Sequence, residues 1–154
     1  MKNIKVLILM GSKSDMSIME QASAVLDEYD VSYKVLVRSA HRTPEATIKA
    51  VHDAETAGCR AFICAAGMAA HLAGVVASQT IFPVIGVPIS AGPLQGQDAL
   101  LSTVMMPPGI PVACVGVNAS KNAGILAVQI LAQSDAVLAD KLRAAREAIA
   151  HTDD

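Results

Sequence analysis

Short apolar runs alternate along the chain with longer segments whose apolar residues recur at helical spacing. The short runs predict five strands, at Ile4 to Met10, Ser32 to Arg38, Ala61 to Ala66, Val84 to Val87 and Val112 to Val117. The last three runs contain no charged position, which is typical of strands buried on both faces of a parallel sheet.

The segments between these runs predict helices. Thr43 is a natural N-cap ahead of Pro44, and Gly58 lies where that helix should end. The other predicted helices are Met16 to Tyr29, Ala70 to Thr80, Asp98 to Val104, Ala119 to Leu131 and, capped by Ser134, Asp135 to Ala150. Because strands and helices alternate without a long linker or a repeat, residues 1–154 are expected to form a single α/β domain. Its central parallel sheet would have helices on both faces, which makes three layers with right-handed crossovers.

Three of the predicted strands end in compact clusters that open the next helix. The clusters are Gly11-Ser12-Lys13-Ser14-Asp15, Ser39-Ala40-His41-Arg42-Thr43-Pro44 and Gly67-Met68-Ala69-Ala70-His71. Since the carboxyl ends of parallel strands share one edge of a sheet, we expect the clusters to converge on one ligand. Two irregular segments, Ile89 to Gln97 and Met106 to Pro111, are expected near the same mouth.

The first cluster suits an anion or a sugar. Gly11 lets the backbone approach a ligand closely, and the N–H groups of the helix start attract phosphate. Ser12 and Ser14 add hydroxyl donors. Asp15 would repel phosphate, so it either caps the helix or accepts hydrogen bonds from sugar hydroxyls. The alternative is an ordinary strand-to-helix turn, and the cluster matches neither a dinucleotide fingerprint nor a nucleoside triphosphate loop.

The second cluster combines a phosphate ligand with a proton carrier. Arg42 offers a planar fork for bidentate phosphate recognition, and Ser39 offers a hydroxyl. His41 is of the residue type that takes and returns a proton near neutral pH. The structural alternative is that His41 only helps to cap the following helix.

The remaining histidines carry weaker signals. His71 either orients a carboxylate in a dry pocket or is a satisfied core histidine on an alanine-rich helix face. His52 and His151 are expected at the surface. No spacing of histidine, cysteine or acidic residues predicts a metal site.

Composition predicts contacts between subunits and argues against nucleic acid. Only 17% of the residues are charged and 53% are hydrophobic, whereas about 25% are charged in an ordinary soluble domain. A short chain cannot hide that much apolar surface alone, so we expect a homo-oligomer. The net charge is −2, basic residues are scattered, and aromatic residues make up 3%, which gives nucleic acid neither a basic patch nor stacking platforms.

No secretory leader or membrane span is expected. The first apolar run stops at Gly11, too soon for a secretory leader. The stretch from Ala61 to Ala77 approaches the length of a membrane span, but two glycines and His71 interrupt it, so a buried strand followed by a helix is predicted. Cys59, Cys64 and Cys114 are odd in number and form no C-x-x-C pair, and Cys64 and Cys114 lie in predicted apolar strands. This indicates core thiols in a reducing, cytoplasmic compartment.

Taken together, the motifs resemble the PurE family of 5-(carboxyamino)imidazole ribonucleotide mutases. The resemblance spans nearly the whole chain in the right order. It rests on the three clusters, extended through Leu72-Ala73-Gly74, and on Pro83-Val84-Ile85-Gly86-Val87-Pro88, Gly96-Gln97-Asp98-Ala99-Leu100-Leu101-Ser102 and Met106-Pro107. It implies a flavodoxin-like fold, a homo-octamer, a small ribonucleotide substrate, and no metal or other cofactor. Met68 departs from the family, which commonly has a second glycine there.

The resemblance also implies roles for individual residues. Ser12 and Asp15 would bind the ribonucleotide, Arg42 its phosphate, and His41 would shuttle the proton. We further expect His71 and the Gly67 region to border a pocket for carbon dioxide, walled by the small residues Ala65, Ala66, Gly67, Ala69 and Ala70. The full expected substrate-binding set is Gly11, Ser12, Asp15, Ser39, Ala40, Arg42, Gly67, His71 and Leu72.

The implied reaction moves a carboxyl group from the exocyclic nitrogen of the substrate to ring carbon 4 in purine biosynthesis. A transient contact with the synthetase that forms the carbamate is a further expectation. Three alternatives stay open: a carboxylase that uses carbon dioxide directly, a flavin binder, and a non-catalytic phosphate-binding or receiver module. Scarce aromatic residues disfavour the flavin binder, and the lack of an acidic pair after the first strand disfavours the receiver.

Overall fold

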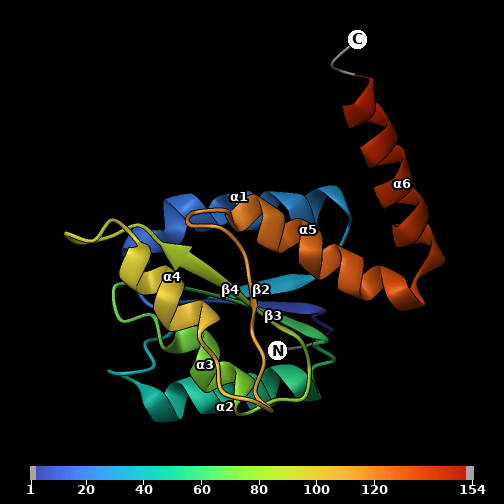
Figure 1. Ribbon diagram of the computed structural model, residues 1–154. Helices are drawn as coiled ribbons and strands as arrows, with labels where there is room; N and C mark the ends of the chain where they lie inside the picture. The colour runs from blue at the N-terminus through green and yellow to red at the C-terminus, as the bar shows by residue number, and fades with distance from the viewer. Residues whose placement is uncertain (1–2, 152–154) are drawn as a thin grey trace.

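A computed structural model describes residues 3–151 and contains a five-stranded parallel sheet between two layers of helices (Figure 1). The strands are β1 (Val6–Met10), β2 (Tyr33–Val37), β3 (Ala61–Gly67), β4 (Val84–Ile89) and β5 (Ala113–Cys114). Their order in the sheet is β2-β1-β3-β4-β5. This is the flavodoxin-like order, with its switch point between β1 and β3. The predicted fold class is confirmed.

Helices cover both faces of the sheet. α1 (Met16–Glu28) and α5 (Ser120–Leu131) lie on one face, and α2 (Pro44–Thr56), α3 (Leu72–Ala77) and α4 (Gln97–Val104) lie on the other (Figure 1). Single turns of 3-10 helix, η1 (Lys13–Asp15) and η2 (Ala132–Ser134), precede α1 and follow α5. The last helix, α6 (Ala136–Ala150), projects away from this body (Figure 1).

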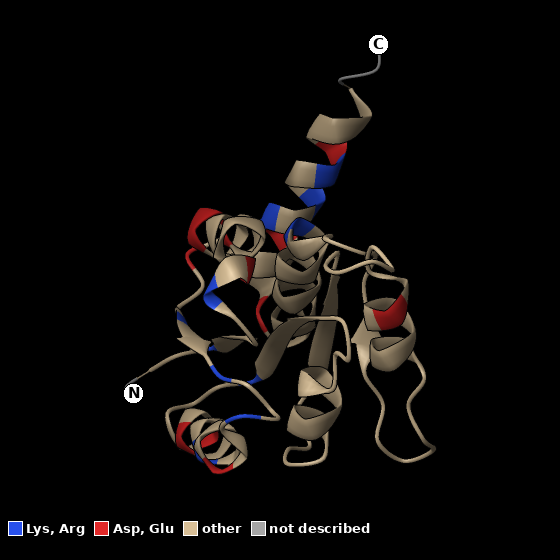
Figure 2. Cartoon of the chain, turned by 90° about the vertical axis from the view of Figure 1, so that its left-hand side faces the viewer, with Lys and Arg blue, Asp and Glu red and all other residues tan. Residues whose placement is uncertain are grey.

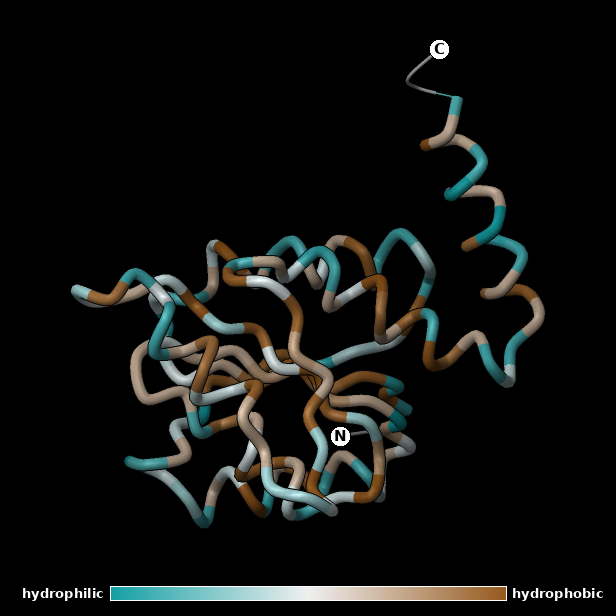
Figure 3. The backbone as a smooth tube through the Cα atoms, in the orientation of Figure 1, coloured by the Kyte–Doolittle hydropathy of each residue, from teal (hydrophilic) through white to brown (hydrophobic). Residues whose placement is uncertain are grey.

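The unbroken hydrophobicity of β1 follows from its position in the sheet. Successive side chains of a strand point to opposite faces. Val6, Ile8 and Met10 therefore pack in the core beneath α1 and α5, while Leu7 and Leu9 pack in the second core beneath α2 and α3. All five side chains are fully buried, and Figure 3 shows the strands as hydrophobic segments in the middle of the molecule.

β5 corrects one prediction. It is only two residues long, its Ala113 is exposed and its Cys114 is half-buried, so the expectation of a strand buried on both faces is wrong. β5 pairs with β4 alone and forms an edge of the sheet. An apolar run cannot reveal whether another strand lies beyond it.

Two helix starts also differ in detail. The side chain of Asp135, not of Ser134, caps α6, because it accepts hydrogen bonds from the backbone N–H groups of Val137 and Leu138. Thr43 does precede α2, but its hydroxyl donates to the carbonyl of Ser39 and accepts from the N–H of Ser39. It therefore closes the turn before the helix instead of capping the helix itself.

The segment Ala61 to Ala77 is a strand followed by a helix, as predicted. β3 and α3 account for most of it, although α3 is shorter than expected from Ala70 to Thr80. No helix among residues 3–151 combines the length and the apolar character needed to cross a bilayer. Acidic and basic residues are interspersed on α2 and α6 (Figure 2).

Gly124 permits the close contact between α1 and α5. A Cβ atom there would lie 2.9 Å from Cβ of Val25 and 3.0 Å from the carbonyl oxygen of Ala22. We expect Gly124→Ala to lower the free energy of unfolding by about 1–3 kcal/mol, as overpacking does. Gly116→Ala is the control, because its Cβ would only meet Cβ of Ala119 at an ordinary 3.6 Å. Equal urea midpoints for the two variants would contradict this account of the α1–α5 contact.

Candidate active site

The carboxyl edge of the sheet brings the three polar clusters into one cavity of about 460 Å³. The cavity lies where the chain leaves β1, β2 and β3. Every residue of the expected set lines it: Gly11, Ser12, Asp15, Ser39, Ala40, His41, Arg42, Gly67, His71 and Leu72. Ser14, Ala66, Met68, Ala69 and Ala91 complete the lining. Convergence of the clusters is therefore confirmed.

The first cluster forms a closed network of hydrogen bonds around η1. The N–H of Ser12 donates to Oδ2 of Asp15 (3.2 Å), and the N–H of Ser14 donates to Oγ of Ser12 (3.3 Å), which completes a capping box. The hydroxyl of Ser14 also lies 2.8 Å from Oγ of Ser12 and 3.1 Å from Oδ1 of Asp15. Asp15 thus closes the capping box of η1, although its side chain makes no capping hydrogen bond to α1; its expected contact with sugar hydroxyls stays a prediction.

Asp15 is an acid held mostly out of water. Its side chain and backbone together are only 7% exposed. Burial raises the pKa of this carboxyl, and the hydrogen bonds from Ser14 and Ser12 partly offset the rise. The carboxylate is therefore anchored in the wall of the cavity, with the serine hydroxyls around it.

Arg42 links the second cluster to the first. Its backbone N–H donates to Oγ of Ser39 (3.2 Å), which stabilises the turn before α2. Its Nη2 crosses to the carbonyl oxygen of Gly11 at the end of β1 (2.9 Å). Since a guanidinium carries five N–H donors, this bond orients the fork at the mouth of the cavity and still leaves donors for an anion.

His41 and His71 meet across the cavity mouth. Nε2 of His41 lies 2.8 Å from Nδ1 of His71, a hydrogen bond in which one ring donates and the other accepts. The rings are perpendicular, with centroids 4.9 Å apart. Both residues are exposed, so the alternative of His71 as a core histidine is wrong. His52 and His151 lie at the surface, as expected.

Close backbone packing builds the opposite wall. A Cβ atom on Gly67 would lie 2.9 Å from Cβ of Ala91, so only glycine fits between β3 and the loop after β4. Met68 has a left-handed backbone (φ 53°), the conformation that suits the glycine common in the family. Ala91 is the residue that the prediction missed, although the irregular segment Ile89 to Gln97 had pointed to it.

Some expected features lie elsewhere. Ala65 and Ala70 are buried and are not part of the cavity lining, unlike the other small residues of the expected wall. The chain from Gly109 to Pro111 enters β5 at the opposite, amino edge of the sheet, because α4 has carried it there. The expectation that this break borders the same mouth is therefore wrong for Gly109 to Pro111, whereas Met106, at its start, lines a neighbouring pocket together with His71.

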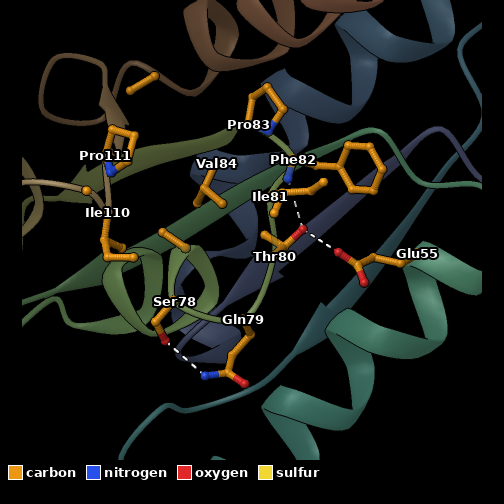
Figure 4. Close-up of a pocket in the computed structure, with 13 residues that line it drawn as sticks. Glu55, Ser78, Gln79, Thr80, Ile81, Phe82, Pro83, Val84, Ile110 and Pro111 are labelled. Carbon is orange, nitrogen blue, oxygen red and sulfur yellow. Dashed lines mark hydrogen bonds between the residues drawn. The ribbon is translucent and has the colours of Figure 1, made fainter.

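A larger cavity of about 800 Å³ lies at that amino edge (Figure 4). Among the described residues that line it, Glu55 is the one ionisable side chain, and the hydroxyl of Thr80 donates to its carboxylate. The other labelled side chains are mostly apolar, including Ile81, Phe82 and Ile110 (Figure 4). The smaller cavity at the carboxyl edge is therefore the better candidate for the active site, because it contains the side chains suited to proton transfer and phosphate binding.

The cysteines do not contribute to the site. Cys59 and Cys64 are buried free thiols, and Cys114 is a half-buried free thiol on β5. Burial raises the pKa of the Cys59 thiol to about 11. Within residues 3–151, no group of three or more histidine, cysteine or acidic side chains is placed to hold a metal ion.

The raised pKa of Asp15 predicts a pH-dependent stability. An acid whose pKa rises on folding stabilises the protein below its ordinary value of 3.8, and this contribution is lost as the pH rises through the raised value. Asp15→Asn stays neutral and keeps an amide oxygen for the N–H of Ser12. We therefore expect the stability of Asp15→Asn relative to wild type to increase between pH 3.8 and neutrality.

Urea unfolding at several pH values measures this difference. Asp53→Asn is the control of opposite sign, because the hydrogen bond from Lys49 lowers the pKa of the exposed Asp53 carboxyl. Wild type should gain stability over Asp53→Asn as the pH rises. A pH-independent difference for Asp15→Asn would contradict the role of burial.

Comparison with known proteins agrees with this geometry. The N5-carboxyaminoimidazole ribonucleotide mutase of Methanocaldococcus jannaschii is 52% identical over 142 residues, which cover 92% of this chain and 88% of that protein. The mutase of the same name from Pyrococcus abyssi is 50% identical over 143 residues, covering 93% of this chain and 82% of that protein. The phosphoribosylaminoimidazole carboxylase of Schizosaccharomyces pombe is 51% identical over 125 residues, which cover 81% of this chain but 23% of that protein.

The fold has a solved counterpart as well. The crystal structure of Treponema denticola PurE superposes with a TM-score of 0.88 at 31% identity, and the match covers 96% of this chain and 92% of that one. The sequence profile of the AIR carboxylase family matches residues 5–152. The chain belongs to the AIR carboxylase family.

Proposed function

We propose that this protein is a mutase that converts 5-(carboxyamino)imidazole ribonucleotide to 4-carboxy-5-aminoimidazole ribonucleotide in purine biosynthesis. The observation that carries the proposal is the presence of His41 and Arg42 at one rim of a cavity that the Gly11 turn also lines. A proton carrier and a phosphate ligand then act on the same small molecule. The names and the high identity of the curated relatives support this reading.

Binding of the ribonucleotide follows from the sides of the cavity. Arg42, held at the carbonyl of Gly11, binds the phosphate through its remaining N–H groups. Ser12 and Asp15 bind the sugar from the adjacent turn, with the hydroxyl of Ser12 and the carboxylate of Asp15 already held by the capping network. Ser39, Ala40 and Leu72 line the same cavity and complete the proposed binding set.

The chemistry needs one proton that travels in a cycle. Protonated His41 gives its proton to the exocyclic nitrogen as the carbamate C–N bond breaks and carbon dioxide leaves. Ring carbon 4 of the aminoimidazole then attacks the trapped carbon dioxide and forms a C–C bond. His41 takes the proton from carbon 4, which restores the ring and the catalyst. General acid–base catalysis of this kind contributes ~10²- to 10⁴-fold in rate.

Confinement supplies a second contribution. Gly67 and the small side chains of Ala66, Ala69 and Ala91 form one wall of the cavity, and carbon dioxide is retained against this wall. Holding both fragments together replaces a bimolecular encounter by an intramolecular one, worth up to ~7–11 kcal/mol in favourable cases. The proposed pocket therefore depends on small residues as much as on His41.

A carboxylase that acts on aminoimidazole ribonucleotide and carbon dioxide directly is the second candidate. The name of the Schizosaccharomyces pombe relative favours it. Freshly prepared carbamate distinguishes the two functions, because a mutase turns it over efficiently without added bicarbonate. Membership of the AIR carboxylase family argues against the flavin-binding and receiver alternatives.

Assembly into a homo-oligomer, an octamer by resemblance, is part of the proposal. Large apolar side chains stand out at the surface: Ile81 is 96% exposed, Met105 76% and Val137 67%. α6 leaves the body with apolar residues spaced between polar ones (Figure 3). A cytoplasmic location and a transient contact with the carbamate-forming synthetase also remain proposals, the first supported by the free cysteines.

Substitution at the cavity rim tests the mutase function. We expect His41→Asn to lower kcat by at least ~10²-fold because the proton carrier is lost. Arg42→Ala should mainly raise KM by weakening the grip on phosphate. His52→Asn, on the exposed face of α2, is the matched control and should retain full activity. Wild-type activity in His41→Asn, measured with fresh carbamate, would remove the proposed proton shuttle.

Sedimentation tests the assembly. We expect a molar mass several times the 15.9 kDa of one chain, because association would remove the exposed apolar side chains from water. A single species of monomer mass at micromolar concentration would contradict the proposed oligomer.

A further inference from the structure

The contact between His41 and His71 has no role in the proton cycle described above. We propose that His71 is a positioning residue that holds His41 in one tautomer, so that Nδ1 of His41 is the atom that gives and takes the proton. The proposal rests on the proposed function, since it concerns the same reaction. Its basis is the 2.8 Å hydrogen bond between Nε2 of His41 and Nδ1 of His71.

Both rings are carried by well-held backbone. The N–H of His71 donates to the carbonyl of Ala69 (2.9 Å), and the carbonyl of His71 accepts from the N–H of Val75 (2.9 Å). The next residue, Leu72, is 2% exposed and anchors the start of α3 in the core. The backbone that carries the His71 ring is therefore fixed by hydrogen bonds and by the packing of Leu72.

The turn around His41 is closed in a similar way. The N–H of Thr43 donates to the carbonyl of Ser39 (2.9 Å), and the N–H of Arg42 donates to Oγ of Ser39 (3.2 Å). These bonds enclose His41 between residues of fixed position. The ring can still rotate about its side-chain bonds, so its orientation depends on a partner, and His71 is that partner.

One position of the hydrogen between His41 and His71 allows both proton transfers, the donation to the exocyclic nitrogen and the removal from carbon 4. If Nε2–H of His41 donates to Nδ1 of His71, neutral His41 has its lone pair on Nδ1 and is a base at that atom. Protonated His41 carries N–H on both nitrogens, keeps the same bond to His71, and is an acid at Nδ1. His71 stays neutral, with its own hydrogen on Nε2, throughout the cycle.

The opposite assignment fails at one step. If Nδ1–H of His71 donated to Nε2 of His41, neutral His41 would carry its hydrogen on Nδ1 and could not accept a proton there. The ring would have to leave His71 and turn over between the two proton transfers. The acceptor role of His71 avoids this rearrangement.

Two substitutions at His71 separate positioning from proton transfer. His71→Ala removes the acceptor, and we expect kcat to fall ~10- to 100-fold, the loss typical of hydrogen-bond partners that orient a metal-ligating histidine, with little change in KM. His71→Asn offers an amide oxygen close to the position of Nδ1 and should restore most of kcat. The side chain of His71 makes no capping hydrogen bond to α3, so neither variant removes a cap. His52→Ala is the control for loss of a histidine elsewhere.

Failure of either kinetic expectation overturns the proposal. Unchanged kcat in His71→Ala would show that His41 needs no partner. Equal losses in His71→Asn and His71→Ala would show that His71 itself transfers a proton.

Solid-state ¹⁵N spectra of histidine-labelled protein test the tautomer without any activity assay. We expect neutral His41, assigned by comparison with His41→Asn, to carry its hydrogen on Nε2 in wild type and to become a mixture of tautomers in His71→Ala. A hydrogen on Nδ1 of neutral His41 in wild type would refute the assignment. If the tautomer is as expected but the carbamate is not turned over, the proposed function fails and the hydrogen-bond assignment stands.

Discussion

The ladder of backbone hydrogen bonds that joins β1 to β2 on one side and to β3 on the other positions the candidate active site. Met10 is in register with Val37 of β2 and with Ala65 of β3. The ladder continues past the strand, because the N–H of Gly11 donates to the carbonyl of Ala65 (3.0 Å) and the N–H of Arg38 donates to that of Met10 (2.9 Å). Three turns that are far apart in sequence therefore begin at nearly the same height on one edge.

Side-chain bonds between the turns then refine this arrangement. Arg42 connects the start of α2 to the end of β1, and His41 connects the same turn to the start of α3. The bond from Arg42 joins the turns after the neighbouring strands β2 and β1, whereas the bond between His41 and His71 joins the turns after β2 and β3, which lie on either side of β1. The cavity is therefore held by links between elements and not by any single loop.

The many apolar side chains of the chain lie in two kinds of place, the cores and the surface. Part of it fills the two cores on either side of the sheet, where alternate residues of β1 face opposite layers of helices. The rest lies on the surface of the single chain, at Ile81, Met105 and Val137 among others. The candidate active site and the exposed apolar side chains occupy different parts of the molecule, because the polar clusters gather at the carboxyl edge of the sheet.

Much of the architecture was predictable because it depends on local patterns. Short apolar runs identified the strands, and the polar clusters after β1, β2 and β3 contain every residue of the expected binding set except Leu72, which the family resemblance added. The parallel topology was sufficient for that step, since it sends all strand ends to one edge.

Other features depend on which elements meet, and only the tertiary structure decided them. The edge position of β5 and the packing of Ala91 against Gly67 depend on neighbours that no sequence window contains. The same holds for the bonds from His41 to His71 and from Arg42 to Gly11, whose partners are about thirty residues apart. Hydrophobic period and capping chemistry are local properties of the chain, whereas side-chain partners at a sheet edge follow from register and strand order, and these are set by the packing of the whole domain.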